Sequence, residues 1–162
     1  MAESTTTPRD PSSRSAVHQE ILVDVDRDRA FRVFTEQFDA IKPREYNLLD
    51  VEIAETVLEP RAGGDVYDRG VDGTTCRWAR VLAYEPTHRL VISWDITVDW
   101  RPETDPDRTS EVEVRFLTEG PDRTRVTVDH RNLERHGEGS STMLPGLDSG
   151  WHVMLGRYAA LT

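Results

Sequence analysis

Two polar side chains lie in strand-like runs of this sequence, where they could take part in chemistry. The guanidinium group of Arg80 could bind a carboxylate or phenolate, or stack on an aromatic ring. Alternatively, Arg80 pairs with a neighbouring carboxylate or extends to solvent. His130 could donate or accept a proton near neutral pH. A lone histidine at a strand end is more often structural, however, and the spacing specifies no Ser, Cys or acid partner for it.

The other motifs indicate no metal, phosphate or thiol chemistry. His130 and His136 do not match a known metal-ligand spacing. Gly63-Gly64 precedes a further strand, and it lacks the Lys and Ser/Thr of a phosphate-binding loop, so it predicts a turn. Cys76 is the only cysteine, which excludes an internal disulfide and is consistent with a reducing compartment. We therefore predict neither a metal ion nor a cofactor.

The composition is that of a globular domain. A chain of 162 residues with 36% hydrophobic and 31% charged residues suits one compact domain. The net charge of -10, with no separate Lys/Arg cluster, argues against nucleic acid as a partner. No apolar run approaches the roughly 18 residues of a membrane span, so we expect a cytoplasmic location and no membrane partner. Lys42 is the only lysine, which we interpret as a compositional habit of the source.

The elements that must position these residues follow from the spacing of apolar residues. Residues 1–15 have little to bury and predict a disordered tail, so the single domain covers residues 16–162. Residues 17–25 alternate like a strand, and Asp26 can cap a helix that ends before Pro43. Six further β runs are separated by turn signals, and the last segment, from Leu144, has helical spacing. These six runs cover residues 51–59, 65–70, 75–84, 89–98, 110–118 and 124–132.

The order strand, helix, six strands, helix predicts an α+β fold. Its curved antiparallel sheet of six to seven strands wraps around the long C-terminal helix. The period of two predicts that Phe116 and His130 face inward with the apolar residues of their strands. In residues 76–83 two alternating sets compete, and we predict that the set containing Trp78, Arg80 and Leu82 faces inward. These choices predict a cavity between sheet and helix, lined by Tyr67, Trp78, Arg80, Trp94, Phe116, His130, Trp151, Met154 and Tyr158.

Several spaced motifs resemble one known family. The matching stretches are residues 58–64 (LEPRAGG), 72–73 (DG), 78–86 (WARVLAYEP), 89–94 (RLVISW) and 150–151 (GW). Together they resemble the single-domain bacterial relatives of the activator of the 90-kDa heat-shock chaperone ATPase, within the START-like superfamily. The resemblance runs from about residue 16 to 162 and implies the helix-grip fold. It departs at residues 137–142, a Gly- and Ser-rich stretch where relatives are often more helical and aromatic.

The resemblance implies three functions, because the superfamily is united by its cavity and not by one reaction. The first is non-enzymatic binding or sequestration of a small hydrophobic or aromatic molecule, by a monomer or homodimer. The second is a co-chaperone-like module that binds a 90-kDa heat-shock chaperone, although residues 1–15 are too few for the second domain of the eukaryotic activator. The third is a polyketide cyclase or dehydratase, with Arg80 orienting the substrate and His130 moving a proton.

Overall fold

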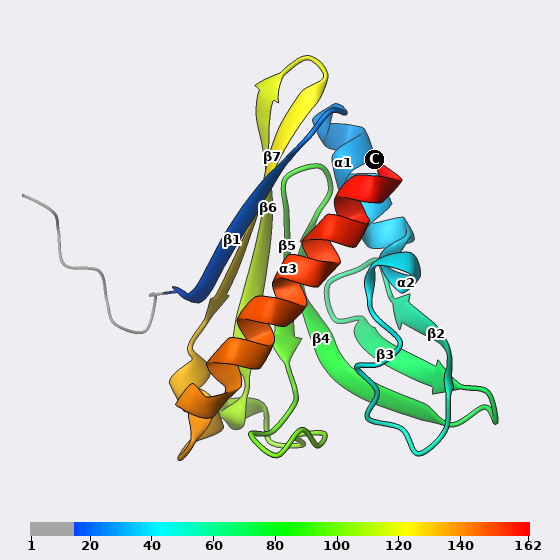
Figure 1. Cartoon of the computed structure of the whole chain (residues 1–162), viewed down its shortest axis with the longest axis vertical. Helices are drawn as coiled ribbons and strands as arrows, with labels where there is room; N and C mark the ends of the chain where they lie inside the picture. The colour runs from blue at the N-terminus through cyan, green and yellow to red at the C-terminus, as the bar shows by residue number, and fades with distance from the viewer. Residues whose placement is uncertain (1–14) are drawn as a thin grey trace, which may run out of the picture.

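Alternating apolar residues build a seven-stranded antiparallel sheet that curls around a long C-terminal helix (Figure 1). The computed structural model describes residues 15–162. None of the helices in this range is long and apolar enough to span a membrane. The elements in chain order are β1 (Ser15–Val23), α1 (Arg27–Glu36), α2 (Phe38–Ile41), β2 (Ile53–Leu58), β3 (Asp65–Gly70), β4 (Thr75–Glu85), β5 (Arg89–Trp94), β6 (Ser110–Gly120), β7 (Arg123–Arg131) and α3 (Leu144–Leu161).

The strand order is β1-β7-β6-β5-β4-β3-β2, so consecutive strands from β2 to β7 are antiparallel neighbours. This confirms the predicted α+β helix-grip fold. β1 pairs with β7, while β2 lies at the opposite edge of the sheet. The segment that contains α1 and α2 must therefore carry the chain from one edge of the sheet to the other. In Figure 1 α3 runs across the sheet, with its C-terminal end beside α1.

The predicted first helix is interrupted near its end. Asp26 caps α1 as expected, because its side chain accepts a hydrogen bond of 2.8 Å from the backbone N–H of Arg29. Gln37 then leaves the helical conformation, with φ -112° and ψ 26°, and α2 follows as a separate short helix. The apolar spacing continues through Phe38 and Ile41, both buried, so the sequence pattern did not reveal this break.

Two β-bulges change which residues of β4 face inward: of the predicted set, Trp78 is buried, whereas Arg80 and Leu82 are not. The pairing passes from Val66↔Ala79 to Tyr67↔Arg77, which leaves Trp78 as an extra residue between the paired positions. Trp78 and Ala79 are consequently both buried, whereas Arg80 lies on the outer side. Alternation then resumes, with Val81 buried and Leu82 outward, 41% exposed, and a second bulge lies between Val81 and Ala83. A bulge inserts one residue into the ladder and so breaks the period of two on which the prediction rested.

The remaining expectations concern the two ends of the domain. Ser15, the last residue of the predicted tail, begins β1, and the rest of that tail lies outside the described residues. The Gly- and Ser-rich stretch before α3 forms a short 3₁₀ turn over Ser140–Met143, preceded by another over Leu133–His136. These turns connect the end of β7 to the start of α3.

Candidate ligand-binding pocket

A cavity of about 330 Å³ lies between the N-terminal half of α3 and the strands β3 to β5. This volume falls in the usual range for small-molecule sites. All four tryptophans of the chain line it, together with apolar side chains from Leu48, Ile96, Leu147 and Met154 and a smaller polar part. Its walls consist of Lys42, Glu45, Tyr46, Asn47, Leu48, Asp68, Trp78, Trp94, Ile96, Trp100, Gly146, Leu147, Gly150, Trp151 and Met154.

Three buried tryptophans form the aromatic inner wall. The ring centroids of Trp78 and Trp94 lie 5.4 Å apart in an edge-to-face arrangement, and those of Trp94 and Trp151 lie 6.1 Å apart. Trp78 also stacks on Phe38 of α2, at 6.1 Å. Each ring of this wall therefore packs against an aromatic ring from another element of the fold, which fixes their relative orientation.

The outer part of the pocket is lined by two exposed aromatic residues, Tyr46 and Trp100, which are 42% and 46% exposed. Both lie against glycines of α3. A Cβ atom added to Gly150 would lie 3.6 Å from the Tyr46 ring, and one added to Gly146 would lie 3.4 Å from the Trp100 ring. The two glycines therefore let aromatic rings approach the helix backbone at the mouth of the pocket.

A buried ion pair forms the polar part of the pocket. The Lys42 ammonium donates to Asp68 Oδ2 at 2.6 Å and to the backbone carbonyl oxygen of Tyr46 at 2.7 Å. Asp68 Oδ1 accepts hydrogen bonds from Thr56 Oγ1 at 2.7 Å and from Trp78 Nε1 at 3.3 Å. The side chains of Lys42 and Asp68 are 7% and 1% exposed. Every oxygen of this carboxylate is thus paired, as a buried charge requires.

Burial lowers the pKa of Lys42, and the adjacent Asp68 carboxylate only partly opposes this effect. The ammonium group has a third N–H, which has no acceptor among the residues that the structure describes. Lys42 Nζ also lies 5.4 Å from the centroid of the Trp78 ring. The pocket therefore offers one cationic hydrogen-bond donor beside an aromatic wall.

Of the residues predicted for the cavity, the structure brings together Trp78, Trp94, Trp151 and Met154. Phe116 and Tyr158 are buried elsewhere in the core, where both contact Phe34. The Tyr158 hydroxyl donates to the backbone oxygen of Ala30 at 2.8 Å. Tyr67 was predicted to line the cavity, but in β3 it is Val66 and Asp68 that face inward. Tyr67 lies half-buried on the outer side.

Arg80 does not line the aromatic pocket. Its Nε donates to Asp95 Oδ2 at 2.9 Å and its Nη2 to Asp95 Oδ1 at 3.1 Å, a bidentate pair, and Nη2 also donates to Thr109 Oγ1. These groups lie in a separate hollow of about 210 Å³. The alternative that Arg80 pairs with a neighbouring carboxylate is therefore the one observed, and its guanidinium is not placed to bind an anion in the aromatic pocket.

His130 is fully buried and does not line the pocket either. Its Nε2 lies 2.7 Å from Ser110 Oγ, which lies 2.7 Å from Nε2 of His136. Burial lowers the pKa of His130 to about 3, so the imidazole is neutral at neutral pH. The Trp94 ring, which lines the pocket, packs against His130 with its centroid 5.3 Å away. The geometry suits the structural alternative for His130.

Among residues 15–162, no group of three or more metal-ligating side chains could hold an ion.

Sequence reasoning missed Lys42 and Asp68. One signal was available, because Lys42 is the only lysine among 20 basic residues. Every other basic residue is arginine, so the single lysine singles out a position where a compact ammonium group stands in place of a guanidinium. Asp68 carries no comparable signal, since it is one of 30 acidic residues and becomes distinctive only when β3 places it inward.

The fold and the pocket together define the class of the protein: it is a helix-grip domain with a cavity between its curled sheet and its C-terminal helix. Residues 24–161 match the family model described as activator of Hsp90 ATPase homolog 1-like protein, and the chain belongs to this family. The motif resemblance is thereby confirmed. Among curated proteins, no sequence matches the chain.

Several solved structures are similar to this chain. One is described as an anthrahydroquino-gama-pyrone synthase, Txn09, complexed with SUM. It is 33% identical, the match covers 95% of this chain and 100% of that chain, and the TM-score is 0.63. Another is CalC from Micromonospora echinospora, described as a self-sacrificing resistance protein, with 27% identity, coverage of 89% and 91%, and a TM-score of 0.62. A protein from Arthrobacter aurescens, 18% identical with coverage of 97% and 90% and a TM-score of 0.58, is similar in fold alone.

Proposed function

We propose that this protein binds a small hydrophobic or aromatic molecule in the tryptophan-lined pocket and holds it without turning it over. The observation that carries the proposal is the pocket itself, a volume of about 330 Å³ in which all four tryptophans meet. Apolar walls supply affinity and a few polar groups orient the ligand. The likeness to CalC, which is described as a self-sacrificing resistance protein, supports a role in resistance to a small molecule.

Native mass spectrometry of the protein, purified gently from its own host, tests this proposal. We expect a complex whose extra mass is released as a small molecule on denaturation. In parallel, 9-fluorenone, a planar aromatic ketone, should bind at one site per chain and quench the tryptophan fluorescence. A bare chain in the mass spectrum, together with no binding of such aromatic probes, would overturn the proposal.

A second candidate is an enzyme that acts on an aromatic polyketide-like substrate in the same pocket. The observation that favours it is the 33% identity to a protein described as a synthase over that protein's whole chain. In this chain the titratable groups at the pocket wall are those of Lys42, Glu45, Tyr46 and Asp68, and these replace His130 as the groups to test. Product formation that is lost in Lys42→Met/Asp68→Asn, which leaves no unpaired buried charge, while binding persists, would favour catalysis over sequestration.

The chaperone partner remains a prediction that rests on the description of the family. A pull-down against a 90-kDa heat-shock chaperone, repeated at low and high salt, tests it. With a net charge of -10, an interaction driven by the outer surface should weaken as the salt concentration rises. Binding that is unaffected by salt would contradict this electrostatic interpretation.

A further inference from the structure

The buried ion pair in the pocket is a costly feature for the fold alone. Two charges must lose their water, and replacing such a pair by apolar residues is often neutral or stabilising. Lys42 and Asp68 are nevertheless 7% and 1% exposed, and both line the cavity. A role in ligand recognition gives this arrangement a physical reason that stability does not provide.

Four hydrogen bonds fix the direction in which the ammonium group faces. Asp68 and the Tyr46 carbonyl take two of its N–H groups, while Thr56 and Trp78 hold the carboxylate in place. The remaining N–H has no oxygen acceptor among residues 15–162, and the centroid of the Trp78 ring lies 5.4 Å from the nitrogen. An acceptor oxygen on a ligand would therefore complete the coordination of Lys42 without displacing a protein partner.

The charge balance of the pair selects the kind of oxygen. Asp68 already neutralises Lys42 at 2.6 Å, so a carboxylate on the ligand would be a second buried anion without its own countercharge. A neutral carbonyl oxygen needs only the free N–H and brings no net charge. The Trp78 ring beside Lys42 provides a flat apolar surface for the ring that carries this carbonyl.

We infer that Lys42 determines the ligand specificity of the pocket, which takes an aromatic ketone or quinone whose carbonyl oxygen accepts a hydrogen bond from Lys42 Nζ, with Asp68 and Trp78 as the positioning residues. This inference rests on the proposed function, because it names the ligand class of the same pocket.

Three probes of one ring system separate this role from simple hydrophobic binding. They are fluorene, which lacks an acceptor, 9-fluorenone, which carries a ring carbonyl, and fluorene-9-carboxylate, which carries an anion. We expect 9-fluorenone to bind about tenfold to a hundredfold more tightly than fluorene, as for a hydrogen bond to a charged donor. The carboxylate should bind no more tightly than fluorene.

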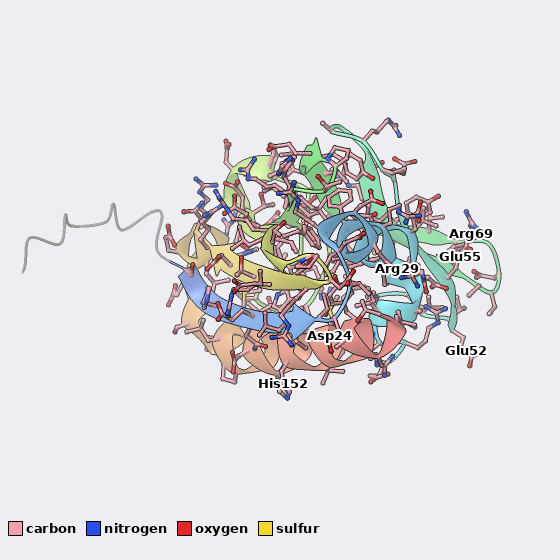
Figure 2. The ribbon with its side chains drawn as sticks, turned by 90° about the horizontal axis from the view of Figure 1, so that it is seen from above. Asp24, Arg29, Glu52, Glu55, Arg69 and His152 are labelled. Carbon is pink, nitrogen blue, oxygen red and sulfur yellow. The ribbon has the colours of Figure 1, made fainter. Side chains whose placement is uncertain are left out.

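The variant Lys42→Met/Asp68→Asn removes both charges together, so that neither is left buried and unpaired. In this variant the preference for 9-fluorenone over fluorene should disappear while fluorene still binds. The matched control is Arg69→Met/Glu55→Gln, which removes an ion pair between β3 and β2 that does not line the pocket and lies at the rim of the molecule in Figure 2. The control should keep the full preference.

The carbonyl stretching band of bound 9-fluorenone gives a second readout. A hydrogen bond from Lys42 should shift this infrared band to lower frequency in the wild-type protein and leave it unshifted in the double variant. If 9-fluorenone and fluorene bind the wild type equally, or if the carboxylate binds best, the inference is overturned while the proposed function stands. If no probe binds the wild type, the proposed function is overturned and the inference with it.

Discussion

Gly150 in α3 provides a test of whether a ligand occupies the pocket. Gly150 is buried and lines the pocket, and an added Cβ would lie 3.6 Å from the Tyr46 ring, an ordinary contact distance. Gly156, six residues further along the same helix, is exposed, and an added Cβ would have nothing within 4 Å. The two positions share one helix but differ in whether a side chain enters the pocket, so they form a matched pair.

Alanine at either position should stabilise the protein by similar amounts. Glycine inside a helix costs about 1 kcal/mol relative to alanine, which for a chain of this size raises Tm by about 2–4 °C. Neither added methyl group is within 3.4 Å of another atom, so no steric strain should cancel the gain. Thermal unfolding of Gly150→Ala and Gly156→Ala measures this, and a loss of stability at Gly150 alone would show that the pocket wall is tighter than described.

Leucine separates the two positions by ligand binding. At Gly150 the leucine side chain would displace ligand groups equivalent to about four methylenes, at about 0.8 kcal/mol each. The loss of about 3 kcal/mol weakens binding of 9-fluorenone by roughly a hundredfold. Gly156→Leu should leave the Kd unchanged. Isothermal titration calorimetry gives both values, and wild-type affinity in Gly150→Leu would refute the assignment of the ligand to this volume.

Three further predictions concern buried charge. Burial would raise the pKa of Glu113, but hydrogen bonds from arginines outweigh it and lower the pKa from 4.5 to about 2. The resulting stability of about 3 kcal/mol should be complete above pH 4.5 and lost as the pH falls through about 2. Urea unfolding of Glu113→Gln should therefore show little of this acid dependence. Burial lowers the pKa of His130 from 6.5 to about 3, so the folded state resists protonation. Up to about 5 kcal/mol of the free energy of unfolding should be lost as the pH falls between these values. His130→Gln should flatten this part of the stability profile, and an unchanged slope would contradict the prediction. Lys42→Met should cost about 3–5 kcal/mol because it leaves Asp68 buried and unpaired, whereas adding Asp68→Asn should recover much of this loss, and strict additivity in urea unfolding would argue against coupling.

The fold could be predicted because each strand and helix carries its own local signal. Turn residues such as Asp72-Gly73 end the strands where expected, and the spacing of Leu147, Trp151 and Met154 predicts the helix that covers the sheet. The break at Gln37 was not predictable from spacing, since the apolar pattern continues through it. Local patterns thus determine which elements form, but they do not fix every irregularity within an element.

The candidate site was predictable only in part, for the same reason. The aromatic wall follows from strand alternation and helical spacing, which place Trp94 and Trp151 on inward faces. The polar part depends on bulges and on long-range pairing. A bulge in β4 turns Arg80 outward to Asp95, and β3 brings Asp68 against Lys42, 26 residues away in the chain. No period of two or of 3.6 residues contains this information.

The polar chemistry of the pocket therefore depends on having a lysine, and not an arginine, at position 42. In the pocket Asp68 and one carbonyl oxygen accept two hydrogen bonds from residue 42. An arginine at this position would bring a wide planar guanidinium with five donors to the same two acceptors. The ammonium group of Lys42 is compact enough to be held by these two acceptors and still present one N–H to the cavity. With two of its five donors occupied, the guanidinium of Lys42→Arg would leave three N–H groups without a protein acceptor, so this variant should be less stable in urea unfolding although it keeps the charge. Wild-type stability in Lys42→Arg would show that the site accommodates a guanidinium and that the compact ammonium group is not required.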